Sequence, residues 1–198
     1  MFYPFDYQYD IISPAEGATG FTELVSCYMQ LDDYVKEIED SGGIILRIEW
    51  FFEKAFALDF GQYKELLDSE GALLKTKLSP GLIAQSPANG TEIQVLLTSV
   101  SGVSLKDVSY KQLGDKSYVV FTKDGNRWLF ASGCDGYSEE QTTRSKSIEA
   151  FKELEKILEN EGMGFHNLVR QWNYIGEILD LSLQGDRRVQ NYQEFNEV

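Results

Sequence analysis

The chain of 198 residues has little cysteine and histidine, and it has no long apolar run. A membrane span needs roughly 20 apolar residues, so we expect no membrane segment. The opening residues lack a secretory signal pattern, and the two cysteines, Cys27 and Cys134, lie far apart. These absences favour a cytoplasmic protein with reduced thiols. A single histidine, His166, excludes a His-rich metal site, and we expect no metal and no other cofactor.

Positive charge is also scarce. The chain has 18 Lys and Arg residues against 32 Asp and Glu residues, which gives a net charge of −14. Proteins that bind nucleic-acid backbones use stripes of Lys and Arg, so we expect no nucleic-acid partner. The sequence contains no phosphate-cradling glycine loop, no zinc-ligand spacing and no nucleophile elbow. It therefore leaves the catalytic residues unknown.

The composition that remains is typical of a globular protein, with 42% apolar and 13% aromatic residues. Apolar residues at helical spacing predict helices at 21–38, from about Asp59, and from Ser138, which has capping-box spacing to Gln141. Asp124-Gly125 between two apolar runs predicts a β-hairpin. Strand-like patterns occupy 44–52, 92–100, 108–112, 118–121 and 127–131.

An internal echo links two parts of the chain. Gly42 precedes Trp50 by eight residues, and Gly164 precedes Trp172 by the same number. Each glycine ends a predicted helix, and each tryptophan lies in an aromatic stretch that predicts a strand, the second of them at 165–174. The pattern predicts two similar units, 1–102 and 103–198. The alternative is that two amphipathic α/β units merely look alike.

Several motifs resemble the Rid superfamily, which is also called YjgF-like or L-PSP endoribonuclease-like. The stretch Arg170-Gln171-Trp172-Asn173-Tyr174, in a chain with two such units, is similar to the chorismatase group of tandem Rid domains. The motifs that carry the Rid resemblance are Leu129-Phe130-Ala131-Ser132-Gly133, Gln141-Thr142, Gly162, Leu168-Val169-Arg170 and Tyr192-Gln193-Glu194-Phe195, with Pro80-Gly81-Leu82 and Pro87 to Ile93 in the first section.

The resemblance implies an α+β fold of two Rid-like, or chorismate-mutase-like, units, each a β-sheet packed against helices. It also implies hydrolysis of the enolpyruvyl ether of chorismate, and assembly with ligand clefts between units. The chain departs from the family in two ways. Leu82 stands where Rid deaminases place a carboxylate-binding Arg, and the second unit stops at Val198 before its closing strands. We therefore expect a degenerate first unit and the N-terminal part of a longer protein.

The candidate site lies on the predicted strand 165–174. Alternate residues of a strand share a face, so His166, Arg170, Trp172 and Tyr174 would point the same way. Arg can pair with a carboxylate through its two-pronged geometry while the rings stack on a planar ligand. The alternative is a packed sheet face with Arg170 in a structural ion pair. His166 is a weak candidate for a general base, because no Ser or Cys partner is placed beside it.

Three functions remain open. The first is a chorismatase-like protein acting on chorismate or a related enolpyruvyl acid, with a small carboxylate-bearing ligand. The second is a Rid-type imine or enamine hydrolase, which the absence of the Arg at Leu82 opposes. The third is a non-catalytic binding or assembly module. A homo-oligomer is compatible with each of them, and Cys134 is either a reactive thiol or a small buried apolar residue.

Overall fold

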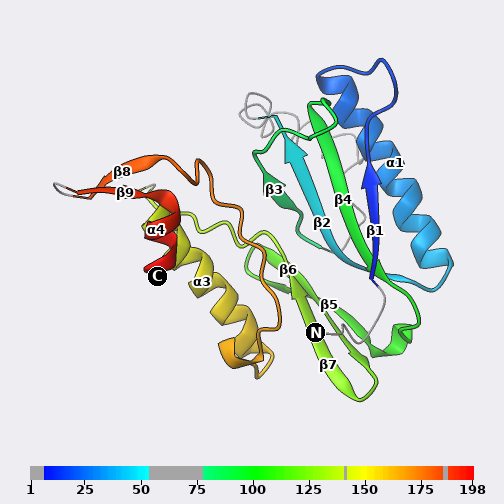
Figure 1. The fold of residues 1–198 in the computed structure, drawn as a ribbon. Helices are drawn as coiled ribbons and strands as arrows, with labels where there is room; N and C mark the ends of the chain where they lie inside the picture. Colours follow the sequence, from blue (N-terminus) through cyan, green and yellow to red (C-terminus); the bar gives the residue numbers. More distant parts are fainter. Residues whose placement is uncertain (1–6, 54–77, 141, 185–186) are drawn as a thin grey trace. The chain divides into compact units, whose positions relative to one another are not determined.

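A computed structural model describes residues 7–53, 78–140, 142–184 and 187–198. The chain divides into two compact units, Met1–Gly133 and Cys134–Val198, which we describe one at a time (Figure 1). Both contain helices and strands, so the predicted α+β class is confirmed. In the part of the chain that the structure describes, no helix is long and apolar enough to cross a membrane.

The first sheet of unit 1 has four strands in the order β1-β4-β2-β3. β1 (Tyr7–Ile12) and β2 (Ile44–Phe52) both pair antiparallel with β4 (Ile93–Val100), whereas β3 (Gly81–Ile83) pairs parallel with β2. β4 therefore lies between two strands that precede it in the chain (Figure 1). The predicted strands at 44–52 and 92–100 are confirmed.

Helix α1 (Phe21–Asp40) packs against one face of this sheet and confirms the prediction at 21–38. Its start is fixed by Glu23, whose buried carboxylate accepts hydrogen bonds from the backbone N–H groups of Glu92 (2.8 Å) and Ile93 (3.0 Å). The apolar residues that recur at helical spacing form its buried stripe. They are Leu24, Cys27, Tyr28, Leu31, Val35 and Ile38.

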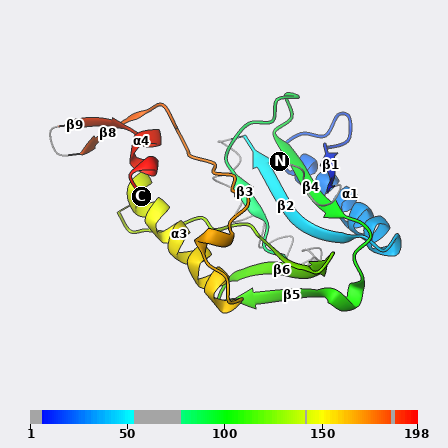
Figure 2. The same ribbon diagram turned by 60° about the horizontal axis from the view of Figure 1, so that its bottom comes forward.

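The second sheet of unit 1 is a three-stranded meander. After a 3-10 turn, η1 (Leu105–Asp107), it comprises β5 (Val108–Leu113), β6 (Lys116–Lys123) and β7 (Asn126–Ala131) in sequence order (Figures 1 and 2). The predicted hairpin is confirmed, and both of its turn residues have positive φ, 53° at Asp124 and 74° at Gly125. Positive φ at both positions suits a type I′ turn and explains the Asp-Gly pair.

The two sheets of unit 1 share one core. Val103, Val119 and Phe121 belong to the same buried cluster as the apolar residues of α1, β2 and β4. The rings of Tyr7 and Phe130 also meet edge to face, with 5.7 Å between their centroids. The predicted boundary between residues 102 and 103 falls inside this core, and the observed division follows Gly133 instead. Pattern matching missed this because both sheets contribute apolar faces to the same interior.

Unit 2 contains α3 (Thr143–Asn160), η2 (Phe165–Asn167), the hairpin of β8 (Leu181–Gln184) and β9 (Arg187–Gln190), and α4 (Asn191–Asn196). The predicted start of the long helix at Ser138 was wrong. The helix begins after Thr142, whose hydroxyl accepts a hydrogen bond from Ser145 N (3.0 Å). The helix ends just before Gly162, which has φ of 66°, so the predicted stop at Gly164 lies two residues further on.

The prediction of a central strand at 165–174 was also wrong. Residues 165–167 form the η2 turn, and residues 168–175 have no regular secondary structure. A strand with β-favouring residues still needs a neighbouring strand to accept its backbone hydrogen bonds. The second copy of the internal echo therefore lacks the element that corresponds to β2. The predicted helix from Asp59 lies outside the described residues.

Candidate functional site

The predicted site residues lie on an exposed segment of unit 2. His166 is part of η2, with its ring folded over Gly164, and Arg170, Trp172 and Tyr174 follow on the irregular stretch. The structure brings Arg170 and Trp172 together, since the guanidinium carbon lies 4.3 Å from the centre of the indole ring. This is a cation–π contact, which keeps the positive charge over an aromatic face. All four side chains are exposed.

The exposure of this segment is unusual because most of its large residues are apolar. We name residues 165–181 the apolar segment. Trp172 and Tyr174 are 39% and 45% exposed, and Leu179 is 73% exposed. Exposed apolar side chains that form a large patch mark interaction sites in soluble proteins. The other large apolar residues that the segment exposes are Phe165, Leu168, Val169, Ile178 and Leu181.

Both ends of the exposed stretch are held in place. At its start, the Phe165 ring meets Phe151 of α3 edge to face, with 6.1 Å between centroids. At its end, the Asn191 side-chain amide donates hydrogen bonds to the carbonyl oxygens of Gly176 (3.2 Å) and Glu177 (3.0 Å). The segment between these anchors is the trace that connects η2 with β8 in Figure 1. Fixed ends reduce the conformational entropy that the segment would lose when a partner binds.

A buried pair of charged side chains lies in the interior of unit 1, on β2. Arg47 and Glu49 project from the same face of the strand, their charged groups are 3.3 Å apart, and both side chains are buried. Thr98 of β4 pairs with Arg47 across the sheet, and its hydroxyl oxygen has no hydrogen-bond partner among the described residues. Sequence reasoning missed this pair. The signal was two opposite charges at alternate positions of the apolar run I-I-L-R-I-E-W-F-F.

A β-bulge positions this buried pair. The pairing of β2 with β4 shifts register between Ile45 and Arg47, and a bulge of this kind turns the following side chains to a new face. The hydroxyl of Tyr110 on β5 donates a hydrogen bond to the carbonyl of Ile45 (3.2 Å), so the second sheet fastens the bulge. Burial raises the pKa of Tyr110 to about 12, so the hydroxyl stays protonated and keeps its hydrogen bond to Ile45 at neutral pH. The hydrogen bond from Tyr110 to Ile45 therefore connects the two sheets and has a structural role.

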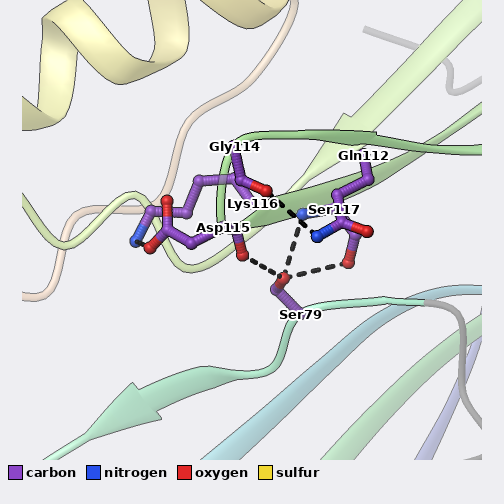
Figure 3. Close-up of polar contacts among 6 residues, drawn as sticks. All are labelled: Ser79, Gln112, Gly114, Asp115, Lys116 and Ser117. Carbon is purple, nitrogen blue, oxygen red and sulfur yellow. Dashed lines mark hydrogen bonds and ion pairs between the residues drawn. The ribbon is translucent and has the colours of Figure 1, made fainter.

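Ser79 is the centre of another polar cluster in unit 1 (Figure 3). Its hydroxyl accepts a hydrogen bond from Ser117 N (2.9 Å), shares one with the Ser117 hydroxyl (2.9 Å), and lies 3.3 Å from the Asp115 carbonyl. Lys116 points away and pairs with the Asp115 carboxylate at 3.3 Å. A nucleophilic serine needs a base within hydrogen-bond reach, whereas these contacts join the chain before β3 to the turn between β5 and β6.

Among the described residues, the Cys27 thiol and the metal-ligating side chains do not form a reactive centre either. Cys27 and Cys134 are both thiols, the first buried and the second half-buried. Burial, with a smaller contribution from the charge of Glu23, raises the pKa of Cys27 to about 12. A thiol with so high a pKa holds almost no thiolate at neutral pH. The described residues also contain no cluster of His, Cys, Asp and Glu side chains that could hold a metal ion.

The protonation state of Cys27 gives a prediction for labelling and for stability. In a Cys134→Ser variant, we expect the native Cys27 thiol to react with a thiol reagent at pH 8.5 only when the protein is unfolded. The folded-state pKa lies above the ordinary value of 9.0, so the stabilisation is complete below pH 9 and is lost as the pH rises toward about 12. The free energy of unfolding should fall there by at most about 1.4 kcal/mol per pH unit.

The measurements are labelling kinetics and urea unfolding at several pH values. A Cys27→Ala variant is the control, because it removes the ionisable group and should show a shallower loss of stability above pH 9. Rapid labelling of the folded protein would contradict the assignment of Cys27 to the interior.

A scan against protein-family models, a search of curated proteins and a search of solved structures found no match to this chain. The resemblance to the Rid superfamily therefore stands as a prediction on the sequence motifs alone. Among the described residues, the apolar segment of unit 2 exposes Trp172, Tyr174 and six other large apolar side chains.

Proposed function

We propose that this chain is a binding or assembly module that docks through the apolar segment of unit 2. The observation that carries the proposal is the exposure of Trp172, Tyr174 and their apolar neighbours on a stretch that is anchored at both ends. Trp, Tyr and Arg are the residues most enriched at the energetic centres of protein interfaces. The segment contains all three, within five residues of sequence.

The energetic case rests on the area that a partner would cover. Burial of apolar surface stabilises a complex by roughly 25 cal/mol per Å², and a large aromatic side chain offers 150–250 Å² in total, as an order of magnitude. Trp172 and Tyr174 keep a substantial part of that area in contact with water. Covering both would contribute on the order of several kcal/mol before the costs of association.

The test compares partners captured by the whole chain and by two variants. Trp172→Ser with Tyr174→Ser removes both rings of the segment, and Tyr137→Ser removes an aromatic ring of unit 2 that is 77% exposed but lies outside the segment. Each protein is immobilised and exposed to a lysate of the source cells, and bound proteins are quantified by mass spectrometry. A binding module should lose its partners only in the double variant. Identical capture by all three proteins would contradict the proposal.

A second proposal keeps the family resemblance. We infer that the chain is chorismatase-like and that Arg170 contributes to a carboxylate-binding wall. The contact of Arg170 with Trp172 supports it, because a guanidinium held over a ring stays available to an acid. A Rid-type imine hydrolase is disfavoured, because Leu82 replaces the carboxylate-binding Arg and is itself 51% exposed on β3.

Calorimetric titration of chorismate into the chain tests this second proposal. If Arg170 binds the carboxylate, we expect Arg170→Ala to weaken binding by at least about tenfold, which corresponds to a charge-assisted hydrogen bond. Arg188→Ala is the matched control, because Arg188 is also exposed in unit 2 but lies on β9. If the two variants bind chorismate with equal affinity, or if the unchanged chain does not bind chorismate, Arg170 is not part of a chorismate pocket.

A further inference from the structure

The stretch from Leu168 to Ile175 has an open backbone edge. In an extended chain, the backbone groups of alternate residues point to the same edge. The residues of one edge, Val169, Gln171, Asn173 and Ile175, make no backbone hydrogen bond among the described residues. Unpaired backbone groups beside β-favouring side chains form a template for the addition of another strand.

We propose that this edge pairs with the same edge of a second copy of the chain, antiparallel and across a twofold axis at Trp172. The inference rests on the proposed assembly function and names its partner. An antiparallel pair of identical segments is self-complementary, because each contact occurs twice. The pairing would turn the irregular stretch into the strand that its sequence predicts.

In this pairing, centred at Trp172, residues 169, 171, 173 and 175 form the hydrogen-bonded pairs. Their side chains share one face of the sheet, and residues of similar chemistry lie opposite each other. Val169 would lie opposite Ile175, so that two β-branched side chains meet. Gln171 would lie opposite Asn173, so that each amide can donate to and accept from another amide. These two side chains already bond within one chain, from Gln171 Nε2 to Asn173 Oδ1 (2.6 Å), which shows that they share a side of the stretch.

The other face is also complementary in this register. Arg170 would lie opposite Tyr174, which adds a cation–π contact to the one that Arg170 makes with Trp172. The two Trp172 rings would meet at the twofold axis. A parallel in-register pairing, or an antiparallel pairing centred on Arg170, would instead set Arg170 against Arg170, and like charges directly opposite are destabilising.

The charge of the chain also favours this stretch as the place where two copies meet. Each copy has a net charge of −14, so most of the surface repels another copy. No acidic residue lies between Phe165 and Gly176, and the stretch contains one positive charge, at Arg170. Depletion of acidic residues is characteristic of interface cores. The pairing is short, so we expect a weak, concentration-dependent dimer rather than a permanent one.

Engineered cysteines test the pairing and its register. In a Cys134→Ser background, Trp172→Cys would place two thiols opposite each other in a non-hydrogen-bonded pair, with Cα atoms about 4.5 Å apart. This separation is within the range that a disulfide bridges. Gln171→Cys is the matched control, because each copy of residue 171 would lie opposite residue 173. On mild oxidation we expect a disulfide-linked dimer from Trp172→Cys at least about tenfold faster than from Gln171→Cys.

Sedimentation velocity of the unmodified chain, from about 1 µM to 1 mM, provides the second measurement. We expect a reversible monomer–dimer equilibrium, at least about tenfold weaker in Asn173→Pro, which removes one N–H of the open edge. A monomer at every concentration without cross-linking would overturn the inference, while the capture experiment would still decide whether the segment binds another protein. A dimer in which Gln171→Cys links as fast as Trp172→Cys would overturn the register.

Discussion

Replacement of Gly136 by alanine is expected to destabilise unit 2 strongly. Gly136 is buried with φ of 63°, and an added Cβ would collide with the carbonyl oxygen of Lys146 and lie 2.8 Å from the backbone N of Ala150. Both atoms belong to the backbone of α3, so relief of the clash requires the helix or the chain at Gly136 to shift. The left-handed conformation and the overpacking each cost about 1–3 kcal/mol, so we expect a loss of about 2–6 kcal/mol.

Gly162 is the matched control for this prediction. It has a similar φ of 66°, but no heavy atom lies within 4 Å of the position that its Cβ would occupy. Gly162→Ala should therefore cost only the backbone part of that loss, about 1–3 kcal/mol. Urea unfolding followed by circular dichroism compares the two variants. Equal losses of stability would show that the close approach of Gly136 to α3 does not contribute.

The second large effect is expected at the buried pair of Arg47 and Glu49. Arg47→Met leaves the carboxylate of Glu49 in the interior without the guanidinium that lies 3.3 Å from it. Removal of one member of a buried ion pair costs about 3–5 kcal/mol. The double variant Arg47→Met with Glu49→Leu should recover most of that loss, because it leaves no buried charge at either position.

An exposed pair on α3 provides the comparison. Lys152 and Glu149 are 2.7 Å apart, and their side chains are 54% and 41% exposed. Lys152→Met should cost only about 0.5 kcal/mol or less. Chemical denaturation of the unchanged chain, the two Arg47 variants and Lys152→Met measures the free energies of unfolding that are compared. If Arg47→Met proves as mild as Lys152→Met, then water or another group satisfies Glu49 and the pair is not essential to the core.

Much of unit 1 could be predicted from the sequence because its signals are local. The apolar spacing of 21–38, the β-favouring run at 44–52 and the Asp-Gly turn each specify one element, and each is present. The bulge at Ile45 and the contact of both sheets with one core involve residues far apart in the chain. These features depend on tertiary packing, which a single pattern does not contain.

The strand conformation predicted for the candidate site was wrong, and the role of its residues stays a prediction. The composition of 165–174 favours a strand, and the aromatic residues with Arg170 do gather on one exposed segment. Whether such a segment becomes a strand depends on a neighbour that accepts its hydrogen bonds, and the sequence of one chain does not reveal that neighbour. The start of α3 was misplaced for a different reason, since Ser138 has capping-box spacing but Thr142 is the residue that caps the helix.

The position of β4 has a consequence for how the protein is made. On the ribosome, Tyr7 emerges long before Val100, the residue with which it pairs, and Ile44 of β2 waits for the same residue. During synthesis, β1 and the apolar strand β2 therefore leave the exit tunnel before the strand that joins them exists. Pairing between distant residues is slow and leaves such strands open to aggregation. The nascent chain is thus most prone to aggregate before β4 emerges. Its folding yield depends on whether β1 and β2 are covered during that interval.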